Sequence, residues 1–583
     1  MKKFLLYLFS ATTLLLGSCS DDKELDDSHF VSFELNVNNT TYTASIADNT
    51  ITITAPKDVD LTHAKVTYQL SEKATVIPDP TAIENWGEDQ AFRVQSQSGE
   101  YVSYRYTTSR SDVLEANSVT LTTQADVDNF AKKNINHIQG NLIIGSPAAT
   151  TDSITNLDAL KSVTHVDYNV VVNSSYAGSN LAGLTNLKYA NGVYIGSENS
   201  YVSFHKKLAV ELPALAESSN IVVHSDSVTS VSLPALTSSN NIYINSIKLN
   251  NLDLTSYAQC YGNFTLKGMS SNDYSSVHSN LVLATLSLPA LKQVNGTLLI
   301  ENFWNISKFS MPQLEEVDGD LQLKYVRGTK KIALPALTTV KNNTNIQAND
   351  GMTSFAAPLL ASTNSLNISS FNQYSINLKR IDLSALKNVT TTLTVQYGGF
   401  TDLALPKLQT IGSKLMLNAD DHLTTLSLPE LLKCPNITVQ SCSSLVSLAI
   451  DKLTTLSTLQ LMNTTVLSDL SLKSVENMDN LTIQYDIKFT TLIAPKLTTI
   501  KSNLTLFGGR NANLAKATVL ANLDSFSLLT KVGRVAITNF ASLADFTGLK
   551  NVIPQLAASS WSVRGCKYNP TYQNMVGGKY KAE

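Results

Sequence analysis

Residues 286–346 contain one sequence phrase three times, and this repetition decides the fold. Residues 286–300 are LSLPALKQVNGTLLI, residues 309–323 are FSMPQLEEVDGDLQL, and residues 332–346 are IALPALTTVKNNTNI. The prolines at positions 289, 312, 335 and 358 are therefore 23 residues apart. A fixed period of this length indicates one structural unit that buries its apolar side only by stacking on its neighbours. The sequence thus predicts a solenoid.

The same unit recurs over most of the chain. Further copies carry prolines at positions 213, 234, 406, 429 and 495, and degenerate copies without proline fill the gaps. Counting the clear and the degenerate copies predicts about 17 coils between residues 141 and 552. Two inserts, residues 268–280 and 507–521, interrupt the period and are expected to form loops.

The first residues predict export and a lipid anchor. Two lysines precede an apolar run over residues 4–16, which is too short to span a bilayer. Residues 16–19, LGSC, resemble the lipobox of bacterial lipoproteins, which implies a signal peptide at residues 1–18 and acylation of Cys19. The acidic residues that follow form a tether over residues 19–29, and they resemble the surface-export signal of Bacteroidota lipoproteins. This resemblance implies a protein held at the outer membrane and facing the cell exterior.

Residues 30–110 show a different pattern. Apolar residues alternate with period two in five to seven short runs separated by turn signals such as Asn38-Asn39 and Ser98-Gly99. Such a pattern predicts a small antiparallel β-sandwich. The segment resembles the immunoglobulin-like spacer domains that follow the lipid anchor in Bacteroidota surface lipoproteins. We expect Trp86 to lie in its core.

Both ends of the predicted solenoid have sequences typical of caps. In residues 113–140, Thr123 and Asp126 have the spacing of a helix capping box, and a short helix there would cover an open sheet edge. Residues 556–583 contain bulky aromatic residues and are expected to cover the other end. The solenoid itself is expected to occupy residues 141–555.

The repeat resembles the receptor L-domain group, whose coils carry a leucine-x-leucine-proline-x-leucine phrase followed by valine or isoleucine and a glycine turn. Residues 294–298 (VNGTL) and 317–321 (VDGDL) match this pattern well, whereas residues 340–344 (VKNNT) lack the glycine. The resemblance implies a mainly β fold, a leucine-rich right-handed β-solenoid. It carries no function, since such folds bind unrelated partners.

Composition excludes several function classes. Charged residues make up 16% of the chain and the net charge is -3, so no basic surface for nucleic acid is expected. The eight histidines have no metal-ligand spacing, and the sequence has no phosphate-binding loop or nucleophile motif. We therefore expect no catalytic residues, no metal and no cofactor. The four cysteines after Cys19 are expected to be unpaired.

The outward positions of the strands are the remaining candidates for a site. Aligning the coils gives one column of polar residues with several amides: Glu301, Lys324, Gln347, Ser369, Gln396, Asn418, Gln440 and Gln484. Such a column is either a ladder that stabilises and solubilises the sheet or a recognition strip, because an amide both donates and accepts hydrogen bonds. Aromatic residues near the column are expected to be exposed: Phe303, Trp304, Phe371 and Tyr374.

These patterns favour non-catalytic binding of an extracellular protein or glycan, in adhesion or recognition. The alternative is a nutrient-capture lipoprotein that serves an outer-membrane transporter, and a purely structural role is a third interpretation. The candidate ligand-binding residues are Phe303, Trp304, Gln347, Phe371, Tyr374, Gln396, Gln440 and Gln484. We expect a monomer.

Overall fold

The computed structural model describes residues 26–57, 59–147, 153–269, 278–347, 349, 351–370, 377–509 and 511–582. The chain is mainly β, with 43% of residues in strands and 8% in helices. It divides into two compact units, one ending at Val113 and one beginning at Leu114. The mainly β fold expected from the sequence is confirmed.

The first unit is built from eight strands in two sheets, with the orders β2-β1-β5 and β3-β4-β8-β7-β6. The strands are β1 (Phe30–Val37), β2 (Thr40–Thr43), β3 (Ser45–Ala47), β4 (Thr50–Ala55), β5 (Lys65–Leu70), β6 (Thr75–Ile77), β7 (Gln90–Gln95) and β8 (Tyr101–Arg110).

Alternating apolar residues from both sheets form one core in this unit. Trp86 is fully buried there, as expected, with its ring 5.4 Å from that of Phe33 and 5.0 Å from that of Tyr106. The expectation of a purely antiparallel sandwich is wrong in one place, because β4 and β8 pair in parallel. Parallel neighbours require a crossover connection, and the chain between β4 and β8 supplies it by forming β5, β6 and β7.

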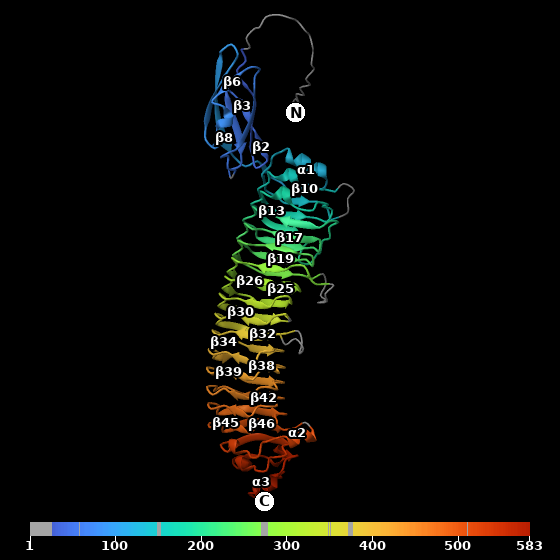
Figure 1. Ribbon diagram of the computed structural model, residues 1–583, viewed down its shortest axis with the longest axis vertical. Coiled ribbons are helices and arrows are strands. Elements are labelled where there is room, and N and C mark those ends of the chain that lie inside the picture. The colour runs from blue at the N-terminus through green and yellow to red at the C-terminus, as the bar shows by residue number, and fades with distance from the viewer. Residues whose placement is uncertain are drawn as a thin grey trace, which may run out of the picture. The chain divides into compact units, whose positions relative to one another are not determined.

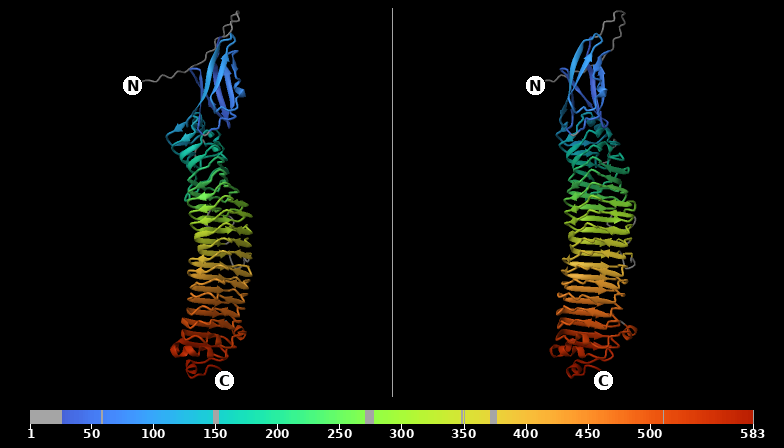
Figure 2. Two further views of the ribbon diagram at one scale, coloured as in Figure 1. Left: turned by 90° about the vertical axis from the view of Figure 1, so that its left-hand side faces the viewer. Right: turned by 60° about the vertical axis from the view of Figure 1, so that its left-hand side comes forward.

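The second unit is a parallel β-solenoid of about 19 turns, whose coils follow one another in chain order (Figures 1 and 2). The repeat phrase explains each coil. Leu286 and Leu288 point inward from one short strand, the following proline begins a turn, and Leu291 and Val294 point inward beyond it. Leu298 then begins the longest side of the coil. All four leucines and the valine are fully buried.

The longest side of each coil adds one strand to a continuous parallel sheet, which we call the main sheet. Its rungs are β10 (Val119–Leu121), β12 (Leu142–Ile144), β13 (His165–Val172), β14 (Tyr189–Ile195), β16 (Asn220–His224), β19 (Asn241–Asn245), β22 (Phe264–Lys267), β25 (Leu298–Phe303), β28 (Leu321–Val326), β30 (Thr339–Gln347), β32 (Ser362–Ser369), β35 (Thr392–Gln396), β38 (Lys414–Asn418), β40 (Asn436–Gln440), β42 (Thr458–Met462), β44 (Asn477–Gln484), β46 (Thr499–Phe507), β47 (Lys531–Thr538) and β48 (Trp561–Arg564).

Two shorter sides complete the coil. Next to the main sheet lie two-residue strands, which merge with the main strand in several coils: β9 (Leu114–Glu115), β11 (His137–Ile138), β18 (Ser238–Ser239), β21 (Gln259–Cys260), β24 (Gln293–Val294), β27 (Glu316–Val317), β34 (Asn388–Val389) and β37 (Thr410–Ile411). The remaining side carries β15 (Leu208–Glu211), β17 (Val228–Ser232), β20 (Asn251–Asp253), β23 (Thr285–Ser287), β26 (Lys308–Ser310), β29 (Lys331–Ala333), β31 (Ser354–Ala356), β33 (Arg380–Asp382), β36 (Asp402–Ala404), β39 (Thr425–Ser427), β41 (Ser447–Ala449), β43 (Asp469–Ser471) and β45 (Thr491–Ile493).

The array is longer than expected at both ends. β10 pairs in parallel with β12, and β48 pairs in parallel with β47, so segments expected only to cover the core each add a rung. Periodicity missed them because neither carries the proline phrase. Helix α1 (Gln124–Ala131) begins with the expected capping box, in which Thr123 accepts from the Asp126 backbone and Asp126 accepts in return.

The unit also contains short helices near its C-terminal end and four cysteines. The insert at residues 507–521 contains helix α2 (Ala512–Lys516), and α3 (Tyr572–Val576) follows the last rung. Cys260, Cys434, Cys442 and Cys566 are unpaired and buried, as expected. In the part of the chain that the structure describes, no helix is long and apolar enough to cross a membrane.

Candidate ligand-binding face

The outer face of the main sheet is set by alternation along each strand. In β28, Leu321 and Leu323 are fully buried, whereas Gln322 and Lys324 between and after them are half-buried and point outward. The neighbouring strands repeat this phase. Each rung therefore contributes outward side chains that stack in columns along the solenoid.

The strand register confirms the column aligned from the sequence. Its members are successive partners from rung to rung: Glu301, Lys324, Gln347, Ser369, Gln396, Asn418 and Gln440. Met462 then lies between Gln440 and Gln484, so the series is not continuously polar. Gln347, Gln396, Gln440 and Gln484 are half-buried, whereas Glu301 and Ser369 are buried.

The expectation that Phe303 is exposed is wrong, since its side chain is fully buried. Asn302 has a φ of 68°, in the left-handed region, and this corner residue ends the strict alternation of the strand. Phe303 consequently turns into the core. Tyr325, Tyr397 and Tyr485 occupy the same left-handed position in other coils, with φ of 54°, 59° and 64°.

Trp304 is half-exposed and held by two neighbours. Its indole Nε1 donates to Asn302 Oδ1 at 3.1 Å, and the Arg327 guanidinium carbon lies 4.1 Å from the ring centroid. This cation–π contact covers a face that a ligand would otherwise use. Phe371, Tyr374 and Cys19 lie outside the described residues.

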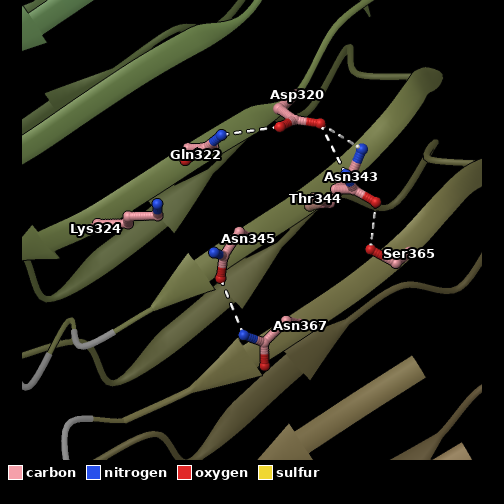
Figure 3. Close-up of a pocket in the computed structure, with 8 residues that line it drawn as sticks. All are labelled: Asp320, Gln322, Lys324, Asn343, Thr344, Asn345, Ser365 and Asn367. Atoms are coloured by element: carbon pink, nitrogen blue, oxygen red, sulfur yellow. Dashed lines mark hydrogen bonds between the residues drawn. The ribbon is translucent and has the colours of Figure 1, made fainter. Parts of the chain in front are cut away.

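A shallow depression of about 460 Å³ lies on the outer face of β28, β30 and β32 (Figure 3). It includes one member of the aligned column, Lys324, and the three residues that stand two positions before that column on the same strands, Gln322, Asn345 and Asn367. Its lining is entirely polar: Asp320, Gln322, Lys324, Asn343, Thr344, Asn345, Ser365 and Asn367.

Most of these side chains bond to one another across the strands. Asp320 accepts from Gln322 Nε2 at 2.9 Å and from the backbone and side-chain nitrogens of Asn343, both at 3.0 Å. Asn367 Nδ2 donates to Asn345 Oδ1 at 3.1 Å (Figure 3). The network fixes the positions of these side chains before any ligand arrives.

Two polar groups of this depression, and one on Gln347 beside it, have no partner among the described residues. They are the Lys324 ammonium, the Gln347 amide nitrogen and the Asn367 amide oxygen, whereas Gln347 Oε1 accepts from Asn345 at 3.4 Å. The depression therefore offers donors and an acceptor in fixed positions to a polar ligand.

Sequence reasoning missed a second amide series at the start of the main strands. Asn169 bonds to Asn141, Asn241 to Asn220, and Asn503 to Asn480, each through side-chain amides of adjacent rungs. Several of these oxygens also accept a backbone N–H of the next coil, such as that of Asn263. These residues stabilise the sheet. The signal was an asparagine that recurs just before the first inward apolar residue of several main strands.

Two buried aspartates were also missed. Asp420 and Asp486 occupy one coil position, two residues after the aligned column, where an earlier coil has Asn349. Each accepts a backbone N–H of the preceding coil: from Gly398 at 2.6 Å for Asp420, and from Thr464 at 2.6 Å for Asp486. Burial raises the pKa of Asp420 to about 7 and that of Asp486 to about 6.

The described side chains of the depression are amides, hydroxyls, one carboxylate and one ammonium group. Within the described residues, no group of three or more histidine, cysteine, aspartate or glutamate side chains could hold a metal ion. The raised pKa values belong to carboxyl groups sealed inside the coil, where no substrate reaches them. The one cation in the lining of the depression, Lys324, lies among amides, hydroxyls and the Asp320 carboxylate.

Comparisons with known proteins bear chiefly on the first unit. Residues 30–108 match the family described as SGBP, N-terminal, a family of Bacteroidota surface glycan-binding proteins. No curated protein matches the chain. A similar solved chain is that of the crystal structure of a TLR13–ssRNA13 complex, with 12% identity, a TM-score of 0.13, and coverage of 76% of this chain and 89% of that one. A similarity this low carries no argument about fold or function. The family match is thus confined to the N-terminal β unit, which is similar to the N-terminal domain of the surface glycan-binding proteins.

Proposed function

We propose that this protein is a non-catalytic glycan-binding protein displayed on the cell surface. The observation that carries the proposal is the match of residues 30–108 to the N-terminal family of surface glycan-binding proteins. That unit is followed by a solenoid whose outer face has fixed polar groups. The match favours a glycan over a protein as the partner.

The chemistry of the outer face suits a glycan. Sugar hydroxyl groups both donate and accept hydrogen bonds, and so do amide side chains. The partnerless groups on Lys324, Gln347 and Asn367 lie on three successive rungs, at the strand spacing of ~4.8 Å. A glycan lying across these rungs would meet a new polar group at each step.

The same proposal includes the site of display. Acylation of Cys19 would hold the protein at the outer membrane facing outward, and the tether and sandwich would separate the solenoid from the bilayer. A single acyl chain anchors only marginally, so the anchor is expected to carry at least two.

Binding by the full chain, made soluble by Cys19→Ala, tests the proposal. Affinity electrophoresis through gels containing neutral or anionic polysaccharides would measure it. We expect retardation by at least one polysaccharide. A triple variant with Lys324→Ala, Gln347→Ala and Asn367→Ala should bind more weakly while keeping its thermal unfolding curve.

A matched triple variant on another side of the coil provides the control. Lys331→Ala, Thr425→Ala and Ser447→Ala also remove one ammonium and two polar groups, from exposed positions of β29, β39 and β41. This variant should bind like the parent. Equal binding by both triple variants would show that the depression in Figure 3 does not contact the glycan, and retention of no polysaccharide would contradict the proposed function.

A further inference from the structure

A second recess lies near the N-terminal end of the solenoid, away from the depression in Figure 3. It consists of two adjoining depressions of about 540 and 290 Å³ that share Tyr189 and Glu217 as lining residues. The larger one extends to His165 and the smaller one to Tyr261. We call the combined recess the Tyr189 groove.

The groove runs along the solenoid, across successive coils. His165 pairs with Tyr189, Tyr189 with Glu217, and Glu217 with Ser238, one residue from each coil. Tyr261 lies one coil further on, because Ser238 pairs with Gln259. Four strand spacings of ~4.8 Å give a groove of roughly 19 Å. A recess of this length holds several sugar rings of a chain, rather than one terminal sugar.

One wall of the groove is a stack of aromatic rings. The ring centroids of His137 and His165 are 5.7 Å apart, and those of His165 and Tyr189 are 6.3 Å apart with planes only 24° from parallel. His137 Nε2 donates to Asp167 Oδ1 at 2.6 Å, which fixes the end of the stack. Tyr189 is therefore held in place by packing before a ligand binds.

A second aromatic surface stands at the far end. Tyr261 is 58% exposed, the highest value among the large exposed apolar side chains of the solenoid. Exposed aromatic rings flanking a polar recess present flat apolar faces, and the C–H face of a sugar ring packs against such a surface. Tyr189 and Tyr261 thus bracket the smaller depression with two such surfaces.

The lining of the groove as a whole carries more negative than positive charge. Asp167 and Glu217 contribute carboxylates and Lys188 contributes one ammonium group. The Glu217 carboxylate is exposed and makes no hydrogen bond or ion pair within the described part of the chain. A free carboxylate accepts hydrogen bonds from sugar hydroxyls and repels an anionic sugar.

We propose that the Tyr189 groove binds an internal segment of a neutral polysaccharide. Sugar rings stack on Tyr189 and Tyr261, and a sugar hydroxyl between them donates to Glu217. This assignment rests on the proposed glycan-binding function and adds to it the site, the charge class and the internal mode of binding. The excess of negative charge in the lining disfavours anionic polysaccharides.

Substitutions in the full chain carrying Cys19→Ala test the assignment by affinity electrophoresis and calorimetry with neutral polysaccharides. Tyr189→Ala, Tyr261→Ala and Glu217→Gln should each weaken binding, the two alanine variants by about tenfold, since truncated aromatic anchors cost more than 1 kcal/mol. Tyr189→Phe keeps the ring and should bind more tightly than Tyr189→Ala. Tyr101→Ala is the matched control, because Tyr101 is 55% exposed but belongs to the sandwich.

The outcomes separate this inference from the proposed function. The inference is supported if the groove variants lose binding while their unfolding curves match that of the parent. Tyr101→Ala should then bind like the parent. If the parent binds a polysaccharide and all three groove variants bind it equally well, the assignment of the groove is overturned but the proposed function is not. Tighter binding of anionic than neutral polysaccharides overturns the charge assignment, and a parent that binds no polysaccharide overturns both proposals.

Discussion

The outer face of the main sheet differs between the early and the later coils. One outward column begins with residues from successive rungs that are apolar or aromatic except for one threonine: Ile143, Val171, Tyr194, Val222, Tyr243, Thr265 and Leu299. The same column continues with mainly amides and hydroxyls: Gln322, Asn345, Asn367, Thr394, Met416, Thr438, Gln460, Thr482 and Thr505. The backbone pairing is the same in both regions.

The difference teaches that the fold depends on inward positions and leaves the outward ones open to specialise. Each outward residue of this column follows an inward residue on the same strand. From Val193 to Leu504 these inward residues are buried and apolar in both regions, except that Thr344 is buried but polar. In the early region, Tyr194 lies over Gly192, where an added Cβ would be 2.3 Å from the ring. Gly192 is itself buried under this ring, so the glycine accommodates a side chain of the outer face rather than one of the core.

The largest expected effect is a difference in the free energy of unfolding between substitutions at two adjacent leucines of β25, one pointing inward and one outward. Leu298→Asp should lower the free energy of unfolding by several kcal/mol, because it buries an unpaired charge at a site with 0% exposure. Leu299→Asp, one residue later and half-exposed, should cost less than about 1 kcal/mol. Chemical denaturation measures both. Similar losses at the two sites would mean that the outer column supports the fold as much as the inner one.

The next effect concerns Asp420, a carboxylic acid at the coil position that the amide Asn349 occupies in an earlier coil. Burial raises the pKa of Asp420 to about 7 from 3.8, so the folded state binds its proton more tightly than the unfolded state. Stability should therefore fall as pH rises from about 4 to about 7. Asp420→Asn removes this loss and should stabilise the protein at pH 8 by up to a few kcal/mol, at about 1.4 kcal/mol per pKa unit.

Asn349 shows why asparagine fits this position. It accepts from the Val326 backbone at 2.7 Å, as Asp420 accepts from Gly398, and its Nδ2 also donates to Leu323 O at 3.0 Å. Thermal unfolding of parent and variant at about pH 4 and pH 8 checks the prediction. A parent as stable as Asp420→Asn at pH 8 would show that the carboxylate is not destabilised by burial.

The smallest effect distinguishes a recognition strip from a stabilising ladder. Gln396→Ala, Gln440→Ala and Gln484→Ala should each change the free energy of unfolding by no more than about 0.5 kcal/mol, because the three amides are half-buried on the outer face. Denaturant midpoints measure this. Losses above about 1 kcal/mol for each substitution would identify the column as a structural ladder.

The sequence was sufficient to predict the repeat, the strand phase and the register, because a 23-residue period with inward leucines leaves one way to stack the coils. It failed at the corners. Extending the alternation past Asn302 predicts an outward Phe303, because a pattern of hydrophobicity does not reveal the left-handed conformation of Asn302. The Tyr189 groove was not foreseen either. It depends on residues of different coils, such as Tyr189 and Tyr261, whose shared recess follows from side-chain packing rather than from any motif.

The central claim is that the solenoid binds a glycan without changing it. The most direct measurement incubates the full chain carrying Cys19→Ala with neutral polysaccharides, measures binding by calorimetry, and follows polymer length by size-exclusion chromatography. We predict saturable binding with unchanged polymer length, and weaker binding by Tyr189→Ala. Absence of binding to every polysaccharide, or shortening of the polymer, would contradict the claim.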